Sequence, residues 1–128
     1  MGQPAAKQGD KAIGIDTHVV MVPAPPGPPV PTPLPHPFSG PLDAGLSTNV
    51  KIQGLPAAIV GSTAHCIPPH VPTLPGVSFQ QPPPNKGDVT SGSTTVKING
   101  KGAARNGDPV ASCGGSSKIV AVSTVSIG

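Results

Sequence analysis

The chain has 128 residues, of which 20 are proline and 17 are glycine, and it carries a formal net charge of +3. It contains no glutamate and a single arginine, and proline recurs through residues 4–84, which together exclude a helical protein. Only 10% of the residues are charged, which argues against disorder, and the lysines form no basic stripe, which argues against nucleic-acid binding. The length predicts one domain over residues 1–128.

The first residues give no sign of a targeting segment. Met1-Gly2-Gln3-Pro4 lacks the basic start and the apolar stretch of a signal peptide, and no apolar run is long enough to span a membrane. We therefore expect synthesis in the cytoplasm, with export only by a dedicated machine. In that compartment Cys66 and Cys113 indicate metal binding or inert burial rather than a disulfide.

A repeat organises the chain. Residues 48–62 and 94–108 share the pattern T-x-V-K-I-x-G-x-x-A-A-x-x-G-[SD]. A third copy is divided between the two ends, because residues 5–10 supply its A-A-x-x-G-D half and residues 124–128 supply its V-x-I half. Three similar units predict pseudo-threefold symmetry within a single chain.

Each copy of the repeat predicts a tight β-hairpin. The V-x-I alternation directs both β-branched side chains to one face of a strand. Gly54 and the Asn99-Gly100 dipeptide suit the turn that follows. The small residues Ala57-Ala58 and Ala103-Ala104 then allow neighbouring backbones to approach closely. Val, Ile and Ala would fill the interior, which predicts an all-β, pseudo-threefold cone of hairpins.

The three connections between the copies differ in length. Proline-rich inserts occupy about residues 11–46 and 63–92, whereas the third connection is short and passes through Cys113-Gly114-Gly115. Pro23 to Pro37 predicts polyproline II structure on the surface. A flexible linker or a proline-rich interaction segment is the alternative, and it would leave histidine and cysteine placed at random.

All four histidines and both cysteines fall within these connections. A threefold arrangement brings the connections to one end, so the potential ligands should converge on a vertex and staple it with a metal ion. Zinc is the metal we expect, because structural zinc sites take four cysteine and histidine ligands, and ferrous iron is the second choice. The preferred ligands are His18, His36, His70 and Cys113, with His65 as the leading substitute for any of the histidines and Cys66 as a further alternate.

A catalytic interpretation is weaker. A cysteine–histidine pair could act as nucleophile and base, with Asp10, Asp16 or Asp108 orienting the base. A molecule built from small hairpins has little room for a substrate cleft, however, and Gly61-Ser62 and Gly92-Ser93 lack the surroundings of a nucleophile elbow. We expect no enzymatic activity.

These residues resemble those of PAAR-domain proteins, and the resemblance covers essentially the whole chain. It is carried by Pro4-Ala5-Ala6-x-x-Gly9-Asp10, by Gly92-Ser93-x-x-Val96-x-Ile98-Asn99-Gly100-Lys101 and by Ala103-Ala104-Arg105-x-Gly107-Asp108. The stretch Leu34-Pro-His-Pro-Phe-Ser-Gly40 and the long second insert are similar to a PAAR-like branch with expanded loops. The resemblance implies a small cone of β-hairpins, with zinc held near the vertex by three histidines and one cysteine.

The resemblance also implies a mechanical function. Such proteins cap the trimeric spike of contractile injection machines, which include type VI secretion systems, extracellular injection particles and phage tails, and help the spike pierce a target membrane. We expect one copy of this chain per homotrimeric spike, with Ala5-Ala6, Val50–Ile52 and Val96–Ile98 at or near the joint. Contact with the membrane would be transient, effector cargo is a further expected partner, and contraction would export the assembled tip. The alternatives are a stand-alone zinc-binding β-module or a proline-rich interaction protein unrelated to secretion.

Overall fold

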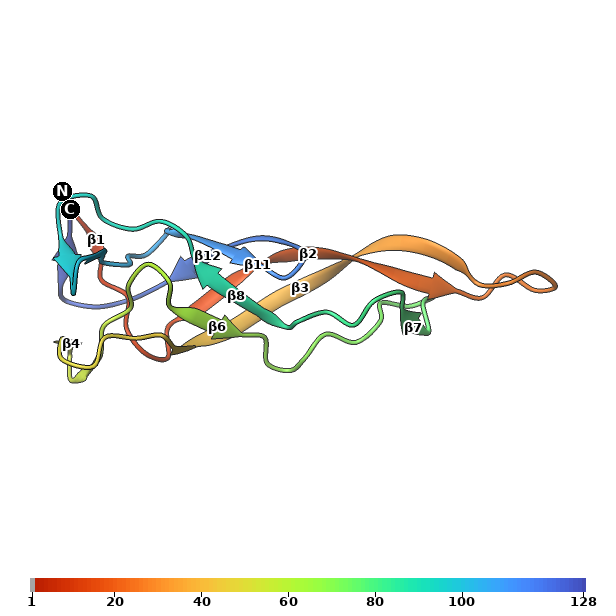
Figure 1. The fold of residues 1–128 in the computed structure, drawn as a ribbon, viewed down its shortest axis with the longest axis horizontal. Helices are drawn as coiled ribbons and strands as arrows, with labels where there is room; N and C mark the ends of the chain where they lie inside the picture. Colours follow the sequence, from red (N-terminus) through yellow and green to blue (C-terminus); the bar gives the residue numbers. More distant parts are fainter. Residues whose placement is uncertain (1) are drawn as a thin grey trace.

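The computed structural model describes residues 2–128, and within this range it contains β-strands and no helix. Figure 1 shows an elongated cone, with both termini, β1 and β4 at the broad end and one long hairpin at the narrow end. The predicted all-β cone of hairpins is therefore confirmed. The strands are, in chain order, β1 (Gln3–Pro4), β2 (Lys11–Val22), β3 (Val30–Ala44), β4 (Lys51–Ile52), β5 (Leu55–Pro56), β6 (Thr63–His65), β7 (Ser78–Phe79), β8 (Lys86–Val89), β9 (Lys97–Ile98), β10 (Lys101–Gly102), β11 (Pro109–Ser112), β12 (Gly115–Val120) and β13 (Ser126–Ile127).

The repeat builds the broad end. Two copies form the short hairpins β4–β5 and β9–β10, and the divided copy forms the pair β1–β13 from the two chain ends. A closed ring of backbone hydrogen bonds joins the copies: the N–H of Ala6 donates to Ala104 at 2.9 Å, that of Ala104 to Ala58 at 3.0 Å, and that of Ala58 to Ala6 at 3.0 Å. All three alanines are fully buried, so no larger side chain would fit this approach. The ring confirms the pseudo-threefold prediction.

The same turn follows each alanine pair. Gly9, Gly61 and Gly107 have φ values of 90°, 97° and 86°, in the region that favours glycine. The next residue, an aspartate or a serine, accepts a hydrogen bond from the N–H three residues earlier, with donor and acceptor at Lys7 and Asp10, Ile59 and Ser62, and Arg105 and Asp108. The three turns send the chain from the broad end into three longer hairpins.

These longer hairpins form the body of the cone. They are β2–β3, β6–β8 and β11–β12, and because β12 also pairs with β2, six strands close into a barrel. The barrel interior is filled by aliphatic side chains and one aromatic ring, chiefly Ala12, Phe38, Leu42, Ala64, Val89, Val110 and Ile119. A closed barrel leaves few free strand edges along the body.

The first insert forms a hairpin. The polyproline II prediction for Pro23 to Pro37 is wrong over Val30–Pro37, which belong to β3 and pair with β2 through the register Met21↔Pro31 to Ile15↔Pro37. Alternate residues of an antiparallel strand direct their N–H groups to the same edge. Prolines at every second position therefore place all the missing donors on the edge away from β2 and leave the ladder intact.

The second insert leaves the barrel after β6 and returns at β8. On its way it lies along β2, where β7 pairs Phe79 with Val20 and Ser78 with Met21. Gly76 makes this approach possible, because a Cβ at that position would lie 2.5 Å from a methyl group of Val20. The insert is thereby held along the edge of β2 that faces away from β3.

Within residues 2–128 no helix is long and apolar enough to cross a lipid bilayer.

Candidate metal centre

Three parts of the chain bring the candidate ligands together inside the cone. Asp16 and His18 lie two residues apart on β2 and so share one face of the strand. Cys113 lies in the turn between β11 and β12, and Gly114 lets that turn approach β2, since a Cβ there would lie 2.6 Å from the Thr17 carbonyl oxygen. His70 comes from the second insert, where its N–H donates to Asn85 Oδ1 at 2.9 Å.

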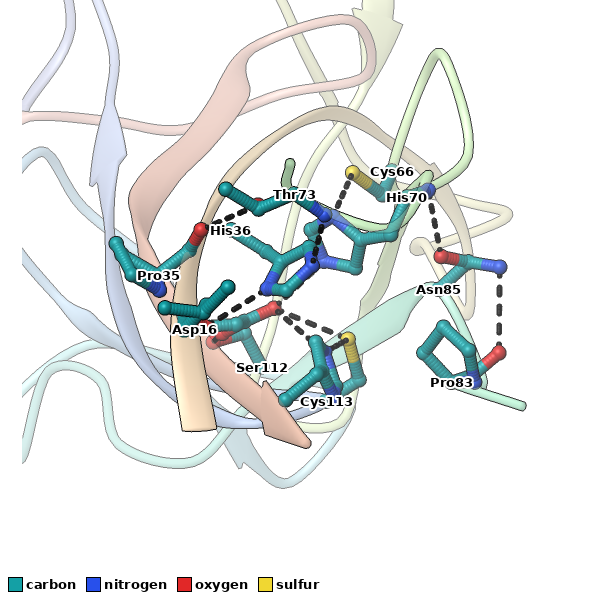
Figure 2. Close-up of polar contacts among 12 residues, drawn as sticks. Asp16, Pro35, His36, Cys66, His70, Thr73, Pro83, Asn85, Ser112 and Cys113 are labelled. Carbon is teal, nitrogen blue, oxygen red and sulfur yellow. Dashed lines mark hydrogen bonds and ion pairs between the residues drawn. The ribbon is translucent and has the colours of Figure 1, made fainter. Parts of the chain in front are cut away.

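Asp16 is at the centre of this cluster, as Figure 2 shows. Its Oδ2 lies 3.0 Å from His70 Nε2 and accepts a hydrogen bond from Cys113 Sγ at 3.0 Å. His18 Nε2 lies 3.2 Å from Cys113 Sγ and 3.9 Å from Asp16 Oδ2. Asp16, His18, His70 and Cys113 thus offer four ligand atoms that all lie within 4.8 Å of one another.

His36 lies beside this cluster on β3. Its ring centre is 5.4 Å from that of His18 and 5.7 Å from that of His70. The side chain is buried, and both ring nitrogens are engaged: Nδ1 lies 2.8 Å from the Leu34 carbonyl oxygen, and Nε2 accepts the N–H of Thr73 at 3.1 Å. The structure therefore brings His36 to the predicted site with its nitrogens bonded to backbone groups.

The two alternates lie farther out. His65 is half-exposed and its Nδ1 lies 2.7 Å from Asp43 Oδ1, which directs it away from the cluster. Cys66 is buried, and its Sγ lies 3.9 Å from His70 Nδ1 and donates to the Pro68 carbonyl oxygen at 3.4 Å. Cys66 thus contacts the Nδ1 side of the His70 ring, opposite the Nε2 atom that faces Asp16, whereas His65 is bonded to Asp43.

Burial sets the protonation states within the cluster. Burial raises the pKa of the Cys113 thiol to about 12, and the hydrogen bond to Asp16 and its charge add to this. Burial also lowers the pKa of His18, with His70 acting in the same direction against the opposing charge of Asp16. Burial alone would raise the pKa of Asp16, but hydrogen bonds from Cys113, Ser112 and His70 outweigh it and leave the pKa lowered. Without a metal ion the cluster therefore holds a carboxylate beside a neutral thiol, and Cys113 must release its proton to become a ligand.

Asp16 is the member of this cluster that sequence reasoning did not include among the potential ligands. The signal that could have found it is the spacing Asp16-x-His18, which places both side chains on one face of a strand. Asp16 is also fully buried, and Ser112 donates a hydrogen bond to its Oδ1. A buried carboxylate that receives so many hydrogen bonds is held in one orientation.

The donor chemistry of the cluster fits zinc. Imidazole nitrogen, thiolate sulfur and carboxylate oxygen are the three kinds of ligand that zinc takes in proteins. The cluster offers two, one and one of them respectively, from three separate hairpins or connections. It can hold one metal ion and in doing so tie together parts of the chain that are far apart in sequence.

The fold and the cluster define a class, a small β-cone with a pseudo-threefold broad end and an interior cluster that could hold a metal ion. The family model for the PAAR motif matches residues 35–121, which is more than half of the chain, so the protein belongs to the PAAR motif family. The PAAR motif is associated with spike-tip proteins of contractile injection systems. No curated protein matches the chain.

Proposed function

We propose that this protein caps the trimeric spike of a contractile injection machine. The broad end would sit on the spike, and the narrow end would lead when the sheath contracts and drives the spike through a target membrane. The protein would be made in the cytoplasm, be assembled at the tip of the particle and leave the cell with it. Membership of the PAAR motif family supports this proposal.

The observation that carries the proposal is the threefold ring of alanines at the broad end. A trimeric spike offers three identical strand ends, and this chain offers three similar hairpins to meet them. One monomer can therefore match one trimer, with backbone hydrogen bonds providing affinity as in β-strand addition. Leu55, Val96 and Val125 of the same hairpins are 38–41% exposed, which suits a surface that a partner covers.

The narrow end is suited to load. The β2–β3 hairpin continues past the metal-binding cluster to the turn between Val22 and Val30, so the outermost point is a proline-rich turn (Figure 1). Below it, a zinc ion held by His18, His70 and Cys113 would join β2, the second insert and the β11–β12 turn. When bound, zinc supplies a structural cross-link, and a site of this kind contributes on the order of 10 kcal/mol to folding.

The proposal includes no catalytic step. The cluster residues would bind the metal ion and hold the chain segments around it in place. The cone would transmit force along its long axis. Effector cargo remains a proposed partner, for which the second insert offers apolar side chains at the surface, with Val71 and Leu74 both mostly exposed.

The proposal is tested by producing the protein together with its spike trimer and measuring the mass of the intact complex. One copy per three spike chains is expected, whereas three copies per trimer would make this protein a ring subunit. Val96→Asp at the broad end should weaken the complex at least about tenfold, because it buries a charge in the joint. Val71→Asp on the second insert is the matched control and should bind normally. Equal effects of the two substitutions, or no complex with folded wild-type protein, would contradict the proposed cap.

A further inference from the structure

Asp16 is placed where a metal ligand is needed. Its Oδ2 is the one atom in the cluster that lies 3.0 Å from both His70 Nε2 and Cys113 Sγ. Its Oδ1 is held by the hydroxyl of Ser112, so the carboxylate cannot turn away. Asp16 is fully buried, and burial of a carboxylate is favourable only when it is paired or coordinates a metal.

The spacing of the four atoms also agrees with a single ion. Zinc bonds of about 2.0–2.3 Å in a tetrahedral site place neighbouring ligand atoms about 3.3–3.7 Å apart. Of the six separations, two are 3.0 Å, from Asp16 to His70 and to Cys113, one is 3.2 Å, from His18 to Cys113, and one is 3.9 Å, from His18 to Asp16, and the remaining two are no more than 4.8 Å. Small side-chain shifts are enough to bring these atoms to ligand distances.

Both ring nitrogens of His36 are already bonded to backbone groups. Because Nδ1 faces a carbonyl oxygen, that of Leu34, it carries the ring proton, and Nε2 is the acceptor for the Thr73 N–H. The Thr73 hydroxyl makes a second bond to β3, to the Pro35 carbonyl oxygen at 2.8 Å. For His36 to bind a metal through Nε2, it would have to release the Thr73 N–H.

We infer that Asp16 is the fourth metal ligand, with His18, His70 and Cys113, and that His36 instead fastens the second insert to β3 through Thr73. This inference rests on the zinc site of the proposed function and departs from the three-histidine, one-cysteine set that the sequence resemblance implies. The family match begins at residue 35, so Asp16 and His18 both lie outside the matched range. His36, the residue that the inference removes from the ligand set, lies within the matched range, so the departure involves both the matched and the unmatched part of the chain.

The inference assigns two different roles to the residues of this region. His18, His70, Cys113 and Asp16 hold the ion, and Ser112 orients the carboxylate. His36 determines where the second insert lies, and so keeps His70 within reach of the other ligands. Loss of His36 should loosen the insert without changing the atoms bound to the metal.

The test is a titration of metal-free protein with Co²⁺ alone, followed by visible absorption, because the ligand-field bands report which atoms bind the ion. Asp16→Asn should shift these bands and weaken binding by at least about tenfold. His36→Ala should leave the bands and the 1:1 stoichiometry unchanged and weaken binding less than Asp16→Asn does, while the Thr73 amide exchanges faster with solvent. Asp43→Asn and His65→Ala, an exposed carboxylate and an exposed histidine, are the matched controls and should behave as wild type.

Three outcomes would overturn the inference. A shift of the bands in His36→Ala would make His36 a ligand, and unchanged bands in Asp16→Asn would remove Asp16 from the set. Wild-type protein that binds no Co²⁺ would remove the metal site itself, without bearing on whether the protein forms a complex with the spike.

If a variant fails to fold, the inference can still be tested by a measurement on the wild-type protein. Addition of Zn²⁺ should change the NMR shifts of the Nε2 atoms of His18 and His70, while the His36 nitrogens keep theirs. A zinc-induced change at His36 Nε2 comparable with that at His70 would contradict the inference.

Discussion

The broad end and the narrow half of this cone are stabilised by different physical means. At the broad end, three copies of one sequence pattern repeat the same backbone hydrogen bonds around a ring of buried alanines. In the narrow half, three unlike hairpins meet around a polar cluster that contains a buried carboxylate, histidines and a thiol. One end is held by symmetry of the backbone, and the other by the chemistry of particular side chains.

The difference follows from the space available. Near the base, a threefold arrangement of small residues fills the interior completely and needs no aromatic side chain. Toward the tip, the interior contains the polar cluster, and one metal ion can link three chain segments there in the volume of a few side chains. The base should therefore tolerate loss of the metal, and the narrow half should not.

The largest effect is expected from loss of a ligand. Cys113→Ser should lower the metal content and the thermal stability together, by several kcal/mol, because metal binding and folding are linked and a site of this kind contributes on the order of 10 kcal/mol. Metal analysis and thermal unfolding of the purified variant check this. Full metal occupancy with unchanged melting would remove Cys113 from the ligand set.

A smaller effect is expected from crowding the alanine ring. Ala58→Leu places a large side chain at a fully buried position and should destabilise the protein by about 1–3 kcal/mol. Ala111→Leu on the exposed face of β11 is the control and should stay within about 0.5 kcal/mol of wild type. Urea unfolding gives both values, and equal stability of the two variants would be inconsistent with close packing in the ring.

Substitutions at two of the three equivalent turns test the symmetry of the base. Gly9→Ala and Gly107→Ala should each cost about 1–2 kcal/mol, because alanine is strained at φ values of 90° and 86°. No atom lies within 4 Å of the added methyl group at either position, so backbone strain is the only difference. The two free energies of unfolding should therefore agree, and a large difference between them would argue against equivalent turns.

The smallest effect is expected at the second cysteine. Cys66→Ser should leave the metal content unchanged and cost no more than about 1 kcal/mol, because a serine hydroxyl can also donate to the Pro68 carbonyl oxygen. Metal analysis beside Cys113→Ser provides the comparison. A loss of metal as large as that in Cys113→Ser would place Cys66 in the ligand set.

The sequence predicted the broad end well because its determinants are local. Alternating β-branched residues, a turn glycine and an alanine pair recur at fixed spacing, and each copy specifies its own hairpin. The convergence of His18, His70 and Cys113 followed from the same reasoning, since equivalent connections leave a threefold base in the same direction. The strand at Val30–Pro37 was missed because proline is compatible with a ladder only in a particular register, and register depends on the partner strand.

The position of Asp16 depends on still longer-range contacts. Its hydrogen-bond partners Ser112 and Cys113 are 96 and 97 residues away in sequence. The bonds of His36 depend on the path of the second insert, which sets where Thr73 lies. Residue type alone therefore favoured the histidine over the carboxylate, and only the packing of the hairpins distinguishes them.

Hydrogen exchange of the zinc-loaded and the metal-free protein tests most directly whether the two ends are stabilised separately. On removal of zinc, the ring amides of Ala6, Ala58 and Ala104 should stay protected, because their donors and acceptors lie within the base. The amides of Thr17 and Thr73, which are bonded next to the metal-binding cluster, should exchange much faster. Equal loss of protection at both ends would contradict the account, because it would make the cone a single cooperative unit that depends everywhere on its metal.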